Sequence, residues 1–110
     1  MYSGEERRTY HRAKTLLSIV YYDGTKFFKE FVHDISAGGL LIKSGEPCDV
    51  GAILDMAVDF SNPTIRAKGT VAWIKKDNTT YRMGIQLKEI NADAANAWAG
   101  YLNRLLGLTA

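Results

Sequence analysis

The chain has 110 residues, 14 of them basic and 12 acidic, which fits a single domain with one modest core and a formal net charge of only +2. A charge this close to zero argues against binding of DNA or RNA through bulk electrostatics, so any anion binding has to come from local groups of cations. Because no apolar run approaches the roughly 18 residues of a membrane span and residues 1–6 lack the features of a signal peptide, we expect a cytoplasmic protein without membrane insertion.

The first half of the chain predicts an arm followed by three strands. Residues 1–12 are polar and show no sustained apolar periodicity, which predicts a flexible amino-terminal arm. Residues 13–22 are rich in β-formers, and the Asp-Gly that follows them is a strong hairpin signal before a second strand over 27–33. A short third strand is predicted over 40–43. Residues 34–39 therefore fall in the connection between the second and third strands, and such connections at one end of a barrel are common ligand sites.

The second half predicts three more strands and a helix. Strands are predicted over 53–60, 65–75 and 81–88, where apolar and polar residues alternate with varying regularity. Asn91 is suited to cap a helix whose apolar residues recur on one face, and Gly107 is suited to end it.

These elements predict an all-β domain over 13–110 with one carboxy-terminal helix at about 91–107. Short antiparallel strands of this kind form closed barrels, so we expect a small six-stranded antiparallel β-barrel. The helix is expected to pack on its side or across one end.

The first functional motif lies in the predicted arm, where residues 7–12 read Arg-Arg-Thr-Tyr-His-Arg. Arg8 and Arg12 are four residues apart, so their side chains share a face in either a helical or an extended segment. Two guanidinium groups can then converge on one anion. In the alternative interpretation these arginines pair with Glu5 and Glu6 on a solvated arm.

The second motif is Asp-Ile-Ser-Ala-Gly-Gly at 34–39. Asp34 and Ser36 lie on one side of a strand end, while Gly38 and Gly39 carry no side chain that would obstruct a close ligand. A carboxylate can accept the ring N–H and amino protons of guanine, and arginine reads O6 and N7 on its other edge. The two motifs together predict an anionic ligand that carries guanine. The alternative is a turn held by side chain to backbone hydrogen bonds, and both interpretations can hold at once.

The order Arg8-x-x-x-Arg12 and then Asp34-x-Ser36-x-x-Gly39 resembles the paired motif of the PilZ domain. The resemblance runs from Glu6 to the final helix and extends to Val71-Ala72-Trp73 and Gly84-Ile85-Gln86-Leu87, although Leu87 stands where the family often has phenylalanine. It implies binding of the bacterial second messenger cyclic di-GMP and no cofactor. The ligand-binding residues it implies are Arg7, Arg8, Arg12, Asp34, Ser36, Gly38, Gly39 and, as a further candidate, Trp73.

The resemblance also implies a role for Arg7, which as a third cation would help to hold a stacked pair of ligand molecules. Trp73 is either a core or half-buried aromatic residue, in line with the alternation from Ile65 through Val71, or a stacking surface for guanine. Trp98 lies on the helix stripe and is expected in the core. The sequence leaves open whether Arg66 or Arg82 reaches the site.

Catalysis finds little support, because the chain has two histidines and one cysteine, Cys48, without the spacing of a metal site or catalytic triad. We expect a receptor rather than an enzyme. Ligand binding would fold the arm over the barrel and create a surface for a partner protein, in the motility and biofilm pathways that the resemblance implies. The alternative is a ligand-independent interaction module of the same fold. An oligonucleotide-binding barrel is disfavoured by the charge, so we expect no DNA or RNA partner.

Overall fold

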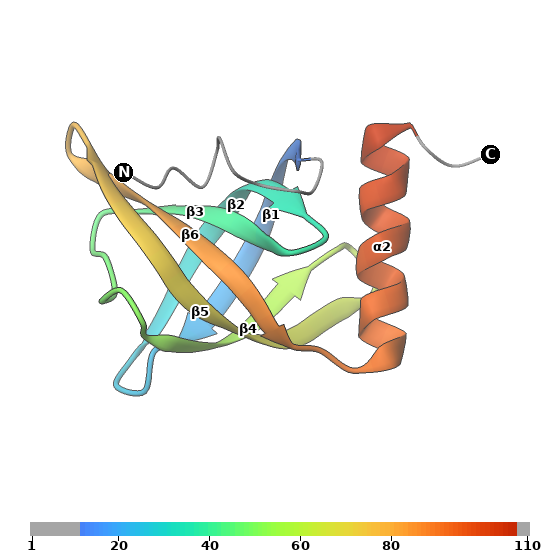
Figure 1. The fold of residues 1–110 in the computed structure, drawn as a ribbon, viewed down its shortest axis with the longest axis horizontal. Helices are drawn as coiled ribbons and strands as arrows, with labels where there is room; N and C mark the ends of the chain where they lie inside the picture. The colour runs from blue at the N-terminus through green and yellow to red at the C-terminus, as the bar shows by residue number, and fades with distance from the viewer. Residues whose placement is uncertain (1–11, 108–110) are drawn as a thin grey trace.

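The structure is a computed structural model, and it describes residues 12–107. These residues form six strands and one helix that follow one another along the chain (Figure 1). Their bounds are β1 (Arg12–Tyr22), β2 (Phe27–Ser36), β3 (Gly39–Ser44), β4 (Ile53–Asp59), β5 (Thr64–Asp77), β6 (Thr80–Glu89) and α2 (Ala92–Leu106).

The strands form a closed antiparallel barrel in the order β1-β2-β3-β6-β5-β4. This confirms the predicted six-stranded barrel with a carboxy-terminal helix. The seam that closes it is short, because β4 pairs with β1 only between Asp55–Val58 and Ile19–Tyr22 among the described residues. The first half of β1 therefore has β2 as its ladder partner, while its second half is paired on both sides.

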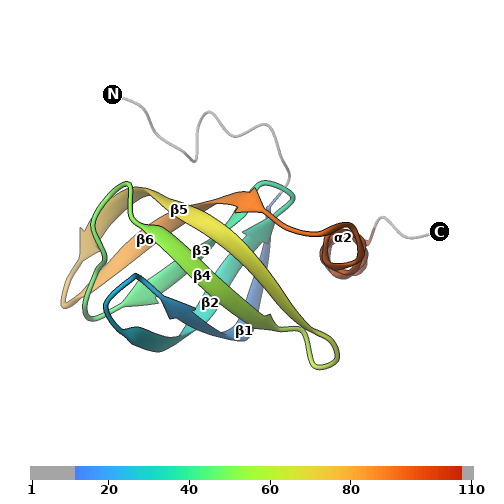
Figure 2. The ribbon, with the colours of Figure 1, turned by 90° about the horizontal axis from the view of Figure 1, so that it is seen from below.

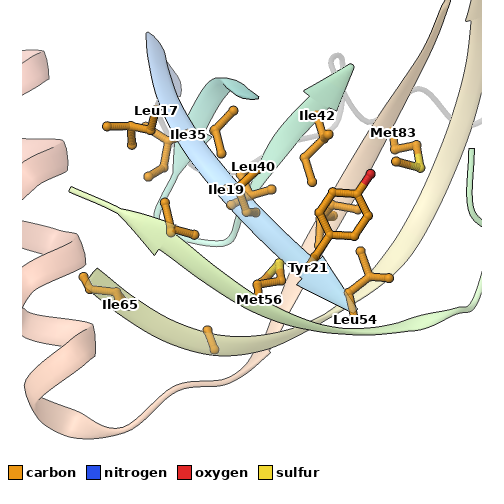
Figure 3. Close-up of a cluster of buried hydrophobic side chains, with 14 of the residues drawn as sticks. Leu17, Ile19, Tyr21, Ile35, Leu40, Ile42, Leu54, Met56, Ile65 and Met83 are labelled. Atoms are coloured by element: carbon orange, nitrogen blue, oxygen red, sulfur yellow. The ribbon is translucent and has the colours of Figure 1, made fainter. Parts of the chain in front are cut away.

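The core fills the barrel with one inward row of apolar side chains from each strand, because alternate residues of a strand point to opposite faces. Figure 3 shows these side chains converging from all six strands, and the residues labelled there are buried: Leu17, Ile19, Tyr21, Ile35, Leu40, Ile42, Leu54, Met56, Ile65 and Met83. The outward rows face away from this core.

Helix α2 begins and ends where the sequence predicts. The side chain of Asn91 accepts a hydrogen bond from the backbone N–H of Ala94 at 2.8 Å, and Gly107 ends the helix in the left-handed conformation, with φ of 69°. The helix lies across one end of the barrel (Figures 1 and 2). Trp98 and Leu102 are buried there, as expected for Trp98. Within residues 12–107, the structure contains no helix with the length and apolar character needed to cross a membrane.

One predicted connection is wrong. Residues 34–39 are not a loop, because β2 continues to Ser36 and β3 starts at Gly39, so only Ala37 and Gly38 form the turn. A two-residue turn suffices because the Ser36 hydroxyl accepts the Gly38 N–H at 3.2 Å. Arg12, the last residue of the predicted arm, is the first residue of β1.

Candidate ligand-binding site

The pairing of β1 with β2 brings the second motif next to the end of the first. Arg12, the first residue of β1, lies opposite Ser36, the last residue of β2. Two residues further along β1, Lys14 lies opposite Asp34. Side chains that lie directly opposite each other, as those of Lys14 and Asp34 do, are about 5 Å apart at Cβ. Arg7 and Arg8 lie outside the described residues, so the structure places one arginine of the motif.

Asp34 continues a row of residues that crosses the outer face of the barrel. It lies opposite Leu41 of β3, which in turn lies opposite Gly84 of β6. Asp34 and Leu41 are each only 8% exposed although neither belongs to the barrel core. The neighbouring His33 has its pKa lowered by burial and then by the charge of Lys43.

The turn between β2 and β3 is held from three directions. The Ser36 hydroxyl accepts the Gly38 N–H and donates to Gly39 O at 3.5 Å. Gly38 O accepts the backbone N–H of Leu87 in β6 at 2.8 Å. Ser36 O accepts the indole N–H of Trp98 at 2.8 Å, which ties the turn to α2. The interpretation of Ser36 as a residue that stiffens its own turn is therefore confirmed.

Gly39 has a packing role that the sequence did not reveal. A Cβ atom added there would lie less than 3.0 Å from the backbone oxygen of Ile85 in β6. Real Cβ atoms essentially never approach backbone so closely, so β3 and β6 can pair at this point because Gly39 has no side chain. This requirement holds with or without a ligand.

Trp73 reaches the outer face because of a β-bulge. The pairing of β5 with β6 shifts between Val71 and Trp73, so that Trp73 lies opposite Gly84. A bulge adds one residue to a strand and moves the following side chain to the other face. The predicted alternation, with Val71 and Trp73 on one face, is therefore wrong at Trp73. A Cβ added to Gly84 would overlap the indole, so the ring covers this glycine. The glycine within a predicted strand was the signal for such a close approach.

The sequence left open whether Arg66 or Arg82 reaches the site, and the structure places them on different parts of the barrel. Arg82 lies opposite Lys75 and two residues before Gly84, hence on the outer face next to Trp73. Arg66 lies opposite Ala57, in the part of β5 that pairs with β4.

A family model for the PilZ domain matches residues 6–104. The chain belongs to the PilZ domain family. No curated protein sequence matches it.

Solved structures share the fold at low sequence identity. The Bacillus subtilis inhibitor of motility MotI superposes with a TM-score of 0.79 and 21% identity, over 94% of this chain and 53% of MotI. The PilZ domain of Escherichia coli YcgR, solved with c-di-GMP, gives 0.76 and 12%, over 93% of each chain. The K. pneumonia MrkH–c-di-GMP complex gives 0.75 and 17%, over 91% of this chain and 52% of MrkH. The chain thus spans about half the length of MotI and of MrkH.

A groove of about 900 Å³ lies on another face of the PilZ domain, and none of the predicted site residues lines it. Phe27, 72% exposed, stands at this groove with its ring 4.7 Å from that of Tyr22. The other lining residues are Val20, Asp55, Met56, Ala57, Arg66, Ala67, Lys68, Lys88, Glu89, Ile90 and Asn91.

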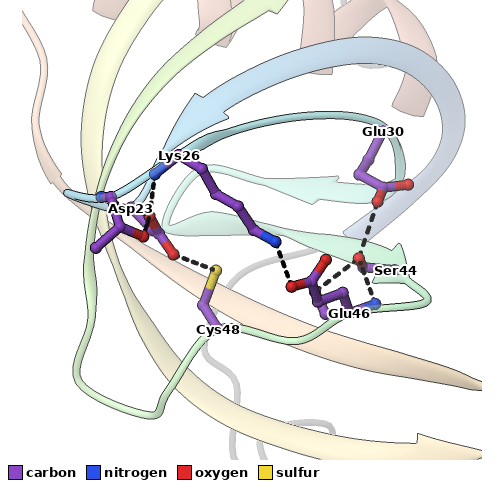
Figure 4. Close-up of polar contacts among 7 residues, drawn as sticks. Asp23, Lys26, Glu30, Ser44, Glu46 and Cys48 are labelled. Atoms are coloured by element: carbon purple, nitrogen blue, oxygen red, sulfur yellow. Dashed lines mark hydrogen bonds and ion pairs between the residues drawn. The ribbon is translucent and has the colours of Figure 1, made fainter.

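Polar contacts at the barrel end opposite α2 offer no reactive centre (Figure 4). Burial raises the pKa of the Cys48 thiol to about 11, so it is protonated at pH 7 and a poor nucleophile. Hydrogen bonds from the Lys26 N–H and then from Thr25 hold the pKa of Asp23 at about 2. Lys26 forms an ion pair with Glu46. Within residues 12–107, no three histidine, cysteine or acidic side chains are grouped so that they could hold a metal ion.

Proposed function

We propose that this PilZ domain is a cytoplasmic receptor for cyclic di-GMP and not an enzyme. The observation that carries the proposal is the register of β1 and β2, which pairs Arg12 with Ser36, two residues along β2 from Asp34. A cation for the phosphate and acceptors for guanine thus start from adjacent strand positions. YcgR and MrkH, which share the fold, were both solved with c-di-GMP.

Each proposed contact has a chemical role. Arg7, Arg8 and Arg12 would bind the phosphates, and the carboxylate of Asp34 would accept guanine N–H groups, with Ser36 as a second acceptor. The backbone at Gly38 and Gly39 lets the ligand approach. The indole of Trp73, on the outer face over Gly84, would support a base by stacking.

In the proposed mechanism the ligand draws residues 1–11, which precede β1, over the barrel and so creates a surface that a partner protein recognises. Ordering a residue costs about 1–2 kcal/mol of backbone freedom, so several charge-assisted hydrogen bonds are needed to offset the cost. The shared fold with an inhibitor of motility supports a partner in motility control. MrkH is described as a c-di-GMP-dependent transcription regulatory factor, so the expected lack of a DNA or RNA partner stays a prediction.

Calorimetric titration of cyclic di-GMP tests the proposal, with GTP and cyclic di-AMP as competitors for specificity. The Arg8→Ala, Arg12→Ala double variant should bind at least about 100-fold more weakly, since each of the two lost charged hydrogen bonds contributes about 1.5–3 kcal/mol. An Arg66→Ala, Lys88→Ala variant removes as much charge from the groove on the other face and should bind normally.

A folded wild type that fails to bind would refute the receptor and favour the ligand-independent interaction module. Two ligands per chain would support the stacked pair held with Arg7, and one per chain would reject it.

A further inference from the structure

Three cations form one row on the outer face of the barrel. Lys43 of β3 lies opposite Arg82 of β6, and Arg82 lies opposite Lys75 of β5. Opposite side chains on neighbouring strands are about 5 Å apart at Cβ, so the three charges gather in one strip. The strand neighbours that point inward belong to the core or pack against it: Ile42, Met83 and Ile74.

This row concentrates like charge with little compensation from the described residues. Like charges directly opposite each other on a sheet destabilise it. The carboxylate of Asp77 forms a long ion pair with the row, its Oδ2 3.9 Å from Arg82 Nε and beyond hydrogen-bond reach. Arg82 Nε is buried and has no hydrogen-bond partner within residues 12–107. Its side chain is 28% exposed, so the guanidinium is partly held against the sheet while Lys43 and Lys75 flank it.

The cation row runs parallel to the row that contains Trp73. Lys75 is two residues beyond Trp73 on β5, and Arg82 is two residues before Gly84 on β6. Two residues along a strand span about 6.6 Å, so the rows are close neighbours on one face. A nucleotide whose base stacks on Trp73 would have its phosphate within reach of the cations. The charge of Lys43 also contributes to the lowered pKa of His33, the chain neighbour of Asp34.

We propose that Lys43, Arg82 and Lys75 form a phosphate-binding row that extends the nucleotide site past Trp73. The proposal rests on the proposed function, because the base on Trp73 is that of cyclic di-GMP. Lysine and arginine are the residues that bind phosphate groups in proteins, and here the fold arrays them on three adjacent strands. The phosphate belongs either to the messenger or to a separate phosphate ligand, and the experiment distinguishes the two.

The test compares a Lys43→Gln, Lys75→Gln variant with a matched Lys29→Gln, Lys88→Gln control. Both remove two positive charges, and both control lysines are exposed and lie outside the row. In calorimetric titrations at low salt, the row variant should bind cyclic di-GMP at least fivefold more weakly, which is about 1 kcal/mol. The control should change less than twofold. Without ligand the row variant should unfold at the same or a higher temperature than wild type, because like-charge repulsion is relieved.

The outcomes separate this inference from the receptor proposal. If wild type binds cyclic di-GMP and the row variant binds it equally well, the row proposal is overturned and the receptor proposal is retained. The same holds if the control variant is weakened as much as the row variant. If wild type does not bind cyclic di-GMP, the receptor proposal fails. The row is then tested by measuring unfolding temperatures with inorganic pyrophosphate added. Pyrophosphate should raise the unfolding temperature of wild type and of the control but not of the row variant. Equal shifts in all three proteins, or none, overturn the row.

Competition identifies the source of the phosphate. Pyrophosphate that displaces cyclic di-GMP shows that the row holds the messenger's own phosphate. Simultaneous binding of the two shows that the row holds a separate phosphate.

Discussion

Replacing Trp98 with phenylalanine should loosen the joint between α2 and the turn that carries the second motif. The indole N–H of Trp98 donates to Ser36 O at 2.8 Å, and the Trp98 and Phe60 rings pack in a T-shaped arrangement with centroids 5.8 Å apart. Trp98 is 2% exposed. Phenylalanine keeps an aromatic ring at this position but has no N–H, so the carbonyl of Ser36 loses its partner.

The magnitude follows from two losses. A hydrogen bond of this kind contributes about 0.5–1.5 kcal/mol net, and the smaller ring gives up packing worth roughly 1 kcal/mol. We expect a loss of about 2 kcal/mol in the free energy of unfolding. For a domain of about 100 residues this lowers the unfolding temperature by about 8–16 °C in a calorimetric scan.

Measurements of cyclic di-GMP affinity separate the effect of losing this hydrogen bond from the effect of a general loss of stability. Leu102→Ala is the matched control, because Leu102 is buried on the same helix and its truncation should cost about 2–5 kcal/mol while the Ser36 bond remains. Below the unfolding transition, Trp98→Phe should weaken cyclic di-GMP binding several-fold and Leu102→Ala should not. Equal affinities of Trp98→Phe and wild type would refute the view that α2 positions the turn.

Two further predictions concern stability. Gly39→Ala should lower the free energy of unfolding by about 3 kcal/mol in denaturant titrations, because its Cβ would clash with the backbone oxygen of Ile85. Gly45→Ala is the control, because the space around Gly45 is open. Equal stability of the two variants would argue against the clash. Asp23 has a folded pKa of about 2 against an ordinary 3.8, so its contribution is present above pH 3.8 and is lost as pH falls toward 2. The stability difference between wild type and Asp23→Asn should therefore shrink over that range, and a constant difference would contradict this assignment.

Local patterns in the sequence were enough to predict the strands and the helix. The caps of α2 at Asn91 and Gly107 depend on the conformations of single residues, so they can be read without knowledge of the fold. The barrel followed from the number and length of the strands. The two-residue turn after Ser36 was not predicted. The residue at which a strand ends depends on the strand that it pairs with, and the sequence of one segment does not contain that information.

The rest of the site depends on contacts between distant segments. The bulge before Trp73 arises where β5 meets β6, and alternation along β5 alone pointed to the wrong face. Trp98 and Ser36 are 62 residues apart, and the sequence of neither segment predicts their hydrogen bond. The row of Lys43, Arg82 and Lys75 exists because β3, β6 and β5 are neighbours, an order that the sequence pattern does not contain.

The short seam between β1 and β4 gives the two halves of β1 different resistance to local opening. The second half, Ile19–Tyr22, must break two ladders to leave the barrel, whereas the first half must break one. Segments with fewer cross-strand bonds open at lower free energy than the global unfolding requires. Arg12 lies at the start of the first half, so we expect its pairing with Ser36 to open at lower free energy than the pairing of Ile19–Tyr22. The position of this proposed phosphate contact would then adjust while the barrel stays closed.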